Sequence, residues 1–225
     1  MEGVTGTWDA IRTRRNVRRF DDRPIPPEDL DRIVVAAALA PSSMNKQHWA
    51  FVVCRERDRL EELSRTGDYA GHVARAAAAI AFLTPRTDEI SQRESIAFDL
   101  GQAVENAILA AWELGIGSCH ASVYDEPRVR QLLGYPPEMT CDLVVSFGYP
   151  DDPASLAPPG SRGGTQTAAR SAARGALRRL RTRRVPFSTA QPTGSILPHG
   201  SPPTPGEPKD PRRAYVWVNR EEGFR

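Results

Sequence analysis

The spacing of apolar positions predicts two amphipathic helices in the first two thirds of the chain. After the proline-rich and acidic stretch PIPPEDL, which suits a helix start, apolar residues recur three and four positions apart at Leu30, Ile33, Val34 and Ala37. The same spacing runs through FDLGQAVENAILAAWELGIG, residues 98–117, with Gly115 where a helix would stop. Small residues line this second helix, so it is either the central helix of the domain or a contact between subunits.

Shorter runs between these helices predict buried strands. They are WAFVVC, AAIAFLT, SCHAS and CDLVVSFGYP, at residues 49–54, 78–84, 118–122 and 141–150. Two further helices are expected at RDRLEELSR and at EPRVRQLLG, the latter with Asp125 as its N-cap and Gly134 just beyond its end. The alternation of helices and strands along the chain predicts a mixed α/β or an α+β domain.

Composition and charge narrow the class of protein. The chain has 225 residues, 40% of them hydrophobic, which is enough for a sizeable core. The net charge is +2, so the overall charge does not indicate a nucleic-acid or membrane-surface protein. Three widely spaced cysteines suggest neither a disulfide framework nor a metal cluster. With no signal-peptide pattern and no apolar run of the ~20 residues needed to span a bilayer, we expect a cytoplasmic location.

A change of composition near Ala154 predicts a domain boundary. Residues 155–206 contain no Asp or Glu and are rich in Arg, Ala, Pro, Gly, Ser and Thr. We therefore expect a folded domain over residues 1–154 and a disordered tail over 155–225. Within the tail, AYVWVN at residues 214–219 alternates like a strand, and ARGALRRLRTRRVPF could form a basic arm that binds nucleic acid or acidic membranes.

The candidate chemistry is a concentration of fixed hydrogen-bond donors. The sequence contains no GxSxG, HExxH, Walker or GxGxxG motif, and its four histidines lie in unrelated contexts. In RRNVRRF, Arg14, Arg15 and Arg18 offer guanidinium groups suited to phosphate or an anionic ring. In APSSMNKQHW, neutral donors and acceptors follow at Ser42, Ser43, Asn45 and Gln47. Such a set suits a polar, phosphorylated ligand, and without an acid/base pair the chemistry would belong to a cofactor.

Four segments, taken in order, resemble the nitroreductase family of FMN-dependent oxidoreductases over residues 8–150: RRNVRRF, APSSMNKQHWAFVV, FDLGQAVENAILAAWELGIGSC and LVVSFGYP. The resemblance implies an α+β fold with a central mixed sheet flanked by helices. It also implies an intertwined homodimer with two FMN sites at the subunit interface. NADH or NADPH would reduce the flavin, and an electron-poor acceptor such as a nitroaromatic or a quinone would take the electrons in a ping-pong cycle.

The resemblance also assigns roles to residues. Arg14 and Arg15 would contact the phosphate and ribityl oxygens, Asn16 would add a hydrogen bond, and Arg18 would reach the pyrimidine edge of the flavin. Four residues, Ser42, Ser43, Asn45 and Gln47, would reach the flavin bound mainly by the other subunit. The main chain at Gly117 and Ser118 would face the ring, and neither a catalytic side chain nor a metal is expected. We assign Arg19 to the surface, and Phe20, Trp49 and Cys119 to packing.

The sequence departs from the family after the GYP strand. Family members continue with a basic GRK-like segment that helps to bind the FMN phosphate, and with an extension that embraces the partner subunit; here no clear equivalent follows. A frameshifted or otherwise replaced C-terminus would explain this difference. Two alternatives therefore remain open: a flavin-binding protein with little activity, or a binding protein with a basic tail.

Overall fold

The structure, a computed structural model, describes residues 6–152 and 215–218. The chain divides into two compact units, and the second of these, residues 157–206, lies outside the described residues. The helices of the first unit are α1 Thr7–Thr13, α2 Pro27–Ala38, α3 Arg57–Leu63, α4 Ile90–Glu113 and α5 Glu126–Leu133, with short 3-10 helices η1 at Ser43–Asn45 and η2 at Ala70–Arg75. The strands are β1 Ala50–Cys54, β2 Ala78–Pro85, β3 Gly117–Ser122, β4 Met139–Gly148 and β5 Tyr215–Val218.

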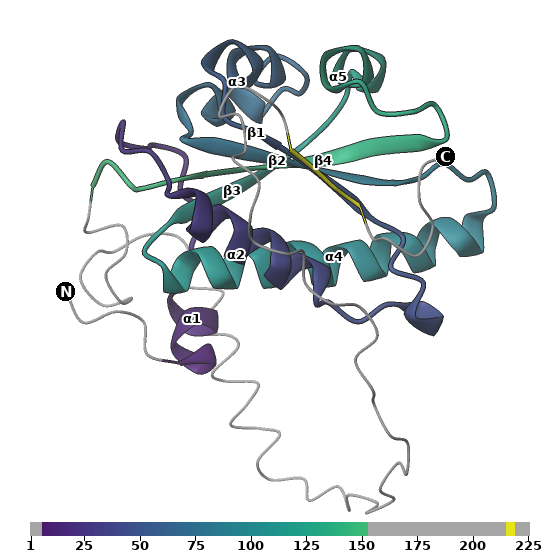
Figure 1. Cartoon of the computed structure of the whole chain (residues 1–225), viewed down its shortest axis with the longest axis horizontal. Coiled ribbons are helices and arrows are strands. Elements are labelled where there is room, and N and C mark those ends of the chain that lie inside the picture. The colour runs from purple at the N-terminus through teal and green to yellow at the C-terminus, as the bar shows by residue number, and fades with distance from the viewer. Residues whose placement is uncertain (1–5, 153–214, 219–225) are drawn as a thin grey trace, which may run out of the picture. The chain divides into compact units, whose positions relative to one another are not determined.

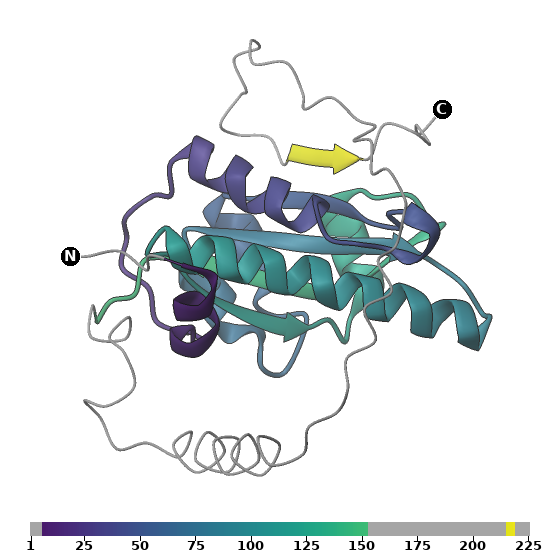
Figure 2. The same ribbon diagram turned by 90° about the horizontal axis from the view of Figure 1, so that it is seen from below.

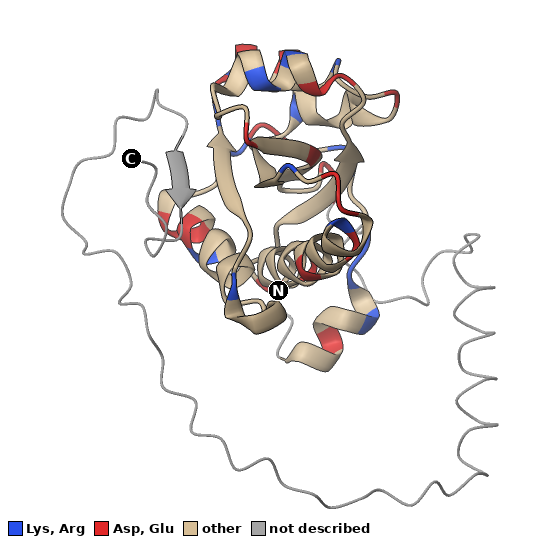
Figure 3. Ribbon diagram, turned by 90° about the vertical axis from the view of Figure 1, so that its right-hand side faces the viewer, with Lys and Arg blue, Asp and Glu red and all other residues tan. Residues whose placement is uncertain are grey.

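A five-stranded sheet in the order β3-β4-β2-β1-β5 separates two layers of helices. Helices α2 and α4 pack side by side on one face, and α3 and α5 cover the other (Figures 1 and 2). Phe51, Phe82 and Phe147 form the centre of the core beneath α2 and α4, and each is fully buried. The charged residues lie mainly on helices and loops, and the strands are almost free of them (Figure 3). This is the expected α+β architecture.

The expectation of a mixed sheet was wrong for the described strands. Every strand pair is antiparallel, and the parallel contact that occurs is an isolated bridge between Asn16 and Ser118. The mixed sheet was an expectation from the family resemblance and not from the apolar pattern of the chain. Here neighbouring strands alternate in direction, and α3 and α5 each connect two antiparallel neighbours. Helix α4 connects β2 to β3, which run in the same direction but are separated by β4.

The central helix α4 is longer than its apolar pattern predicted. It begins at Ile90, whereas the apolar pattern indicated a start near Phe98. The pattern did not predict the first turns, ISQRESIA, because they lack the apolar spacing of an amphipathic helix. It ends at Glu113, and Gly115 has a left-handed φ of 74°, as expected for a residue that stops a helix. Three alanines, Ala103, Ala107 and Ala111, are fully buried in the core, so the small residues serve central packing.

The caps of α5 confirm a local prediction. The Asp125 side chain accepts a hydrogen bond from the Arg128 backbone N–H, and Gly134 follows the helix with a left-handed φ of 72°. Both residues satisfy backbone groups that a helix end leaves free. Within the described residues, no helix combines the length and apolar character needed to cross a membrane.

The predictions for the tail lie almost entirely outside the described residues. This holds for the expected disorder, the basic arm and the replaced C-terminus. Residues Tyr215–Val218 are the exception. They form β5, which pairs antiparallel with β1, so the alternating pattern of this segment does correspond to a strand.

Candidate functional site

The arginine-rich segment Arg14–Phe20 is an extended stretch held in its middle and at its C-terminal end by backbone contacts. In the middle, the Val17 N–H donates to the Ser118 carbonyl of β3 at 2.9 Å. At the C-terminal end Phe20 bridges to Pro150, and the Asp21 N–H donates to the Tyr149 carbonyl at 2.8 Å. Both contacts join it to parts of the chain about 100 residues or more away, so the arginines stand on a fixed backbone.

Some side chains of this segment lie in the core and others on the surface. Val17 and Phe20 are each 5% exposed and point into the core, whereas Arg18 and Arg19 lie on the surface. The Arg19 side chain is 84% exposed and pairs with Asp151. Phe20 is therefore confirmed as a core anchor and Arg19 as a surface residue.

Gly117 allows the segment to approach the sheet. A Cβ atom at this position would lie 2.6 Å from the Cβ of Val17, far inside van der Waals contact. Any side chain there would push Val17, and with it the arginines on either side, away from β3. Gly117 and Ser118 are the first two residues of β3, and the Ser118 carbonyl accepts the hydrogen bond from the Val17 N–H.

Arg14 and Arg18 also have charged or polar neighbours. The Arg14 Nε donates to Glu105 Oε1 of α4 at 2.6 Å, with both side chains partly exposed. The Arg18 guanidinium lies near His72 and Cys119, where its positive charge lowers the pKa of both groups. Burial acts more strongly on Cys119 and leaves the pKa of its thiol raised. Cys119 is 1% exposed, so it is a packed thiol and not a nucleophile, as expected.

The second predicted segment forms a strained loop around η1. Three residues other than glycine, Met44, Asn45 and Gln47, have left-handed φ values of 53°, 55° and 50°. Each such residue costs of order 1 kcal/mol or more, and the surrounding structure must hold it in place. Two hydrogen bonds do so: the Gln47 N–H donates to Ser42 Oγ at 2.8 Å, and the Ser43 N–H donates to Asp99 Oδ2 at 2.9 Å.

Sequence reasoning missed Asp99. It lies on α4, is 3% exposed, and shares a face with the buried residues Ile96 and Ala103. An acidic residue in register with the buried positions of an apolar helix was the available signal, since such a carboxylate needs a partner. That partner is a backbone N–H of the strained loop.

We expect Asp99→Ala to loosen this loop. Without the carboxylate, the Ser43 N–H loses its acceptor, and the free energy of unfolding should fall by about 1–3 kcal/mol. Hydrogen exchange of the Ser43 amide, followed by NMR, should accelerate. Asp99→Asn is the matched control, because it keeps an acceptor oxygen of the same size. Equal exchange rates in the two variants would show that Asp99 does not hold the loop.

The two predicted segments attach to different sides of α4. The loop reaches the helix at Asp99, and the arginine segment reaches it at Glu105. Six residues along an α-helix correspond to a rise of about 9 Å and a rotation that leaves the two positions about 120° apart. A shared flavin site between two subunits, as the resemblance implies, remains a prediction.

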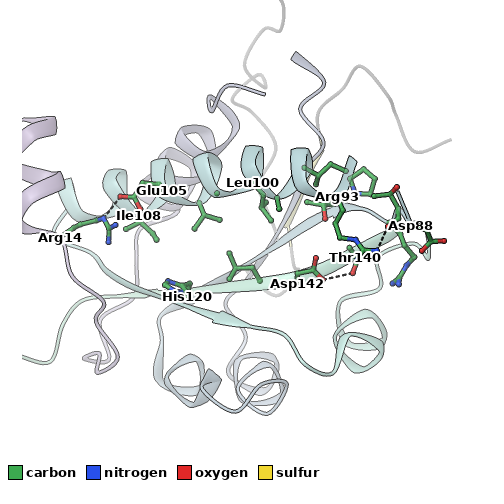
Figure 4. A pocket seen from close by; sticks show the side chains of 18 residues that line it. Arg14, Asp88, Arg93, Leu100, Glu105, Ile108, His120, Thr140 and Asp142 are labelled. Carbon is green, nitrogen blue, oxygen red and sulfur yellow. Dashed lines mark hydrogen bonds and ion pairs between the residues drawn. The ribbon is translucent and has the colours of Figure 1, made fainter. Parts of the chain in front are cut away.

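A cavity of about 580 Å³ lies between α4 and the strands β2, β3 and β4 (Figure 4). Its helix side is apolar, and its strand side carries Thr84, His120, Thr140 and Asp142. Arg14 and Glu105 line one end, Asp88 and Arg93 the other (Figure 4). The volume falls in the range of small-molecule sites. Of the ten predicted cofactor-binding residues, all within the described part of the chain, Arg14 alone lines it, and sequence reasoning did not anticipate it.

Other reactive groups in the described residues are structural. The three cysteines are buried, and burial raises the pKa of Cys54 and of Cys141 to about 12. His72 lies 2.8 Å from Ser146, but Ser146 is fully buried and already donates to the Cys119 carbonyl, so this pair is not a nucleophile and base. Among these residues no cluster of three or more metal-binding side chains occurs.

Comparison with known proteins agrees with the family that the four sequence segments resemble. The sequence profile of the family described as "Nitroreductase family" matches residues 11–68 and 66–149. A protein of Archaeoglobus fulgidus named "Putative NADH dehydrogenase/NAD(P)H nitroreductase" is 38% identical over 146 residues, which cover 63% of this chain and 84% of that protein.

Solved structures agree with the sequence match. A structure from Parabacteroides distasonis, which also bears the name "Putative NADH dehydrogenase/NAD(P)H nitroreductase", is 27% identical with a TM-score of 0.59, covering 71% of this chain and 94% of its own. An "FMN-dependent Nitroreductase" from Clostridium difficile is 25% identical with a TM-score of 0.59, covering 70% of this chain and 92% of its own.

Proposed function

The chain belongs to the nitroreductase family, and from this we propose that it is an NAD(P)H-dependent oxidoreductase that uses FMN. Electrons from NADH or NADPH would pass to an electron-poor acceptor such as a nitroaromatic or a quinone, with donor and acceptor using the site in turn. The observation that supports this most is the attachment of the arginine segment to β3 through Val17, Gly117 and Ser118.

The residues at this position fit FMN by charge and shape. The ligand needs cations for its phosphate, donors for its polar ring edge and a flat apolar surface for its ring system. Arg14, Arg15 and Arg18 supply fixed cations, Asn16 adds an amide, and the cavity beside Arg14 has an apolar wall of Leu100, Val104 and Ile108. We assign the phosphate and ribityl contacts to Arg14 and Arg15, and the pyrimidine edge to Arg18.

We assign the second group of contacts to a second copy of the chain. Ser42, Ser43, Asn45 and Gln47 lie in the strained loop, attached to a different side of α4 from Arg14. A homodimer would let the loop of one subunit approach the arginine segment of the other, next to the main chain of Gly117 and Ser118. Backbone strain concentrated in one loop is typical of functional sites.

The chemistry when FMN is bound is hydride acceptance and electron release by the isoalloxazine ring. The protein contributes position and charge. Arg18, whose backbone is held on either side at Val17 and at Phe20, would place a fixed positive charge where negative charge develops on reduction, and such preorganised charge stabilises the reduced ring. The burial of Cys119 keeps its thiol in the neutral form beside this site.

The test is an absorbance spectrum of the purified protein after FMN is added and the excess is removed. We expect flavin bands at about one FMN per chain, bleached by NADH or NADPH under nitrogen. Arg18→Gln should lower the reduction potential of the bound flavin and weaken its binding by roughly tenfold, the loss of one charge-assisted contact. Arg19→Gln is the matched control, since it removes the neighbouring, exposed arginine. Colourless wild-type protein would contradict the proposal.

A further inference from the structure

Two side-chain contacts attach the start of the arginine segment to α4. The Trp112 Nε1–H donates to Thr13 Oγ1 at 2.9 Å, and the Arg14 Nε–H donates to Glu105 Oε1 at 2.6 Å. Glu105 and Trp112 are seven positions apart in α4, so they lie on the same side of the helix, about 10 Å from each other along its axis. The helix therefore holds both the last residue of α1 and the arginine that follows it.

The contact at Trp112 is structural. Thr13 and Trp112 are 4% and 2% exposed, and the Thr13 hydroxyl, which accepts from Trp112, donates its own proton to the Asp9 carbonyl at 2.5 Å. Trp112 also packs in the buried cluster that contains Val17. This contact fixes the backbone from which the Arg14 side chain extends.

The contact at Glu105 adds little to stability. The Arg14 and Glu105 side chains are 33% and 39% exposed, and ion pairs with this much exposure contribute little to the free energy of unfolding. The pair nevertheless lies at one end of the cavity, and both residues line it (Figure 4). An arginine held by one edge of its guanidinium has lost side-chain freedom before a ligand arrives. A ligand that binds this arginine therefore has less entropy to overcome.

We propose that Glu105 is a positioning residue of the flavin site, which holds the Arg14 guanidinium where it meets the phosphate of FMN. The carboxylate also repels the phosphate, so its hydrogen bond and its charge act in opposite directions. The hydrogen bond has the larger effect, because salt and solvent screen the charge of a partly exposed carboxylate. The phosphate contact rests on the proposed function, whereas the pairing of Arg14 with Glu105 does not.

The first measurement needs no flavin. ¹H–¹⁵N NMR of the arginine Nε–H groups in the full-length protein should show an Arg14 signal, identified by its loss in Arg14→Lys, that exchanges slowly with water. Exchange should stay slow in Glu105→Gln, which keeps an acceptor oxygen, and become faster in Glu105→Ala. Glu113→Ala is the matched control, because it breaks another ion pair of α4, with Arg32, and should leave the signal unchanged. Equal exchange in wild type and Glu105→Ala overturns the proposal, even if the protein binds FMN.

The second measurement separates positioning from charge. FMN and riboflavin differ only in the phosphate, so the ratio of their dissociation constants reports on the phosphate contact alone. Glu105→Gln and Glu105→Ala remove the same negative charge, but only glutamine keeps an acceptor for the Arg14 Nε–H. We expect the preference for FMN over riboflavin to be about fivefold lower in Glu105→Ala than in Glu105→Gln, the cost of immobilising one long side chain. The same preference in both variants would overturn the proposal.

A double substitution locates the effect at Arg14. In an Arg14→Gln background the two Glu105 variants should show the same preference for FMN, because Glu105 acts through Arg14. A difference that persists in this background would mean that Glu105 acts on the flavin directly, and the positioning role would be wrong. A wild-type protein that shows the slow Arg14 signal but binds neither flavin would contradict the proposed function, and with it the phosphate contact, but not the pairing.

Discussion

Replacing Gly117 by alanine should destabilise the protein by about 1–3 kcal/mol, the usual cost of forcing an extra methyl group into a packed site. The new Cβ would lie 2.6 Å from the Cβ of Val17 and equally close to one of its γ carbons. Val17 is buried and its N–H is bonded to Ser118, so neither partner can move without breaking this attachment. The arginines on both sides of Val17 would shift, and we expect FMN binding to weaken with stability.

Gly101→Ala is the matched control for this prediction. Gly101 lies within α4, and a Cβ atom added to it would have no neighbouring atom within 4 Å, so alanine has room there. Alanine also favours a helix over glycine by about 1 kcal/mol, so this variant should be slightly more stable than wild type. Urea unfolding and FMN titration of both variants test the pair. If Gly117→Ala were as stable as Gly101→Ala, the close approach of Val17 would not be what requires glycine.

Acid should destabilise the protein through His72. The pKa of this side chain is about 4 in the folded protein, against an ordinary value of 6.5. Between these values the unfolded chain binds a proton that the folded protein does not, so stability is lost as the pH falls from 6.5 to 4 and is fully present above 6.5. The charged and titratable groups that act on His72 are Arg18 and His120. The shift corresponds to a loss of roughly 3 kcal/mol at most.

Urea unfolding at pH 7 and pH 4.5 measures this loss. His72→Asn, which cannot take up the proton, should show a distinctly smaller change between the two pH values than wild type. His48→Asn is the control, because it removes a half-buried histidine elsewhere and leaves His72 in place. The same pH dependence in wild type and His72→Asn would mean that another group is responsible.

Local sequence patterns predicted much of the fold. The apolar spacing located α2 and the second half of α4, Asp125 and Gly134 located both ends of α5, and the apolar runs located four strands to within two residues. These signals are local, because a helix face or a cap depends on residues within a few positions of each other. The start of α4 and the direction of the strands were not predicted, since the first turns lack an apolar face and pairing is a long-range property.

The sequence by itself determined which chemical groups are available: the arginines of RRNVRRF, the polar loop at Ser42–Gln47 and the glycine before Ser118. Only the tertiary structure decided how they are held. Val17 meets Ser118, Ser43 meets Asp99, and His72 meets Ser146, pairs that are between 56 and 101 positions apart in the chain. No periodicity within a helix or strand encodes such contacts. They arise when the sheet and α4 pack, and this packing also determines which buried polar groups find a partner.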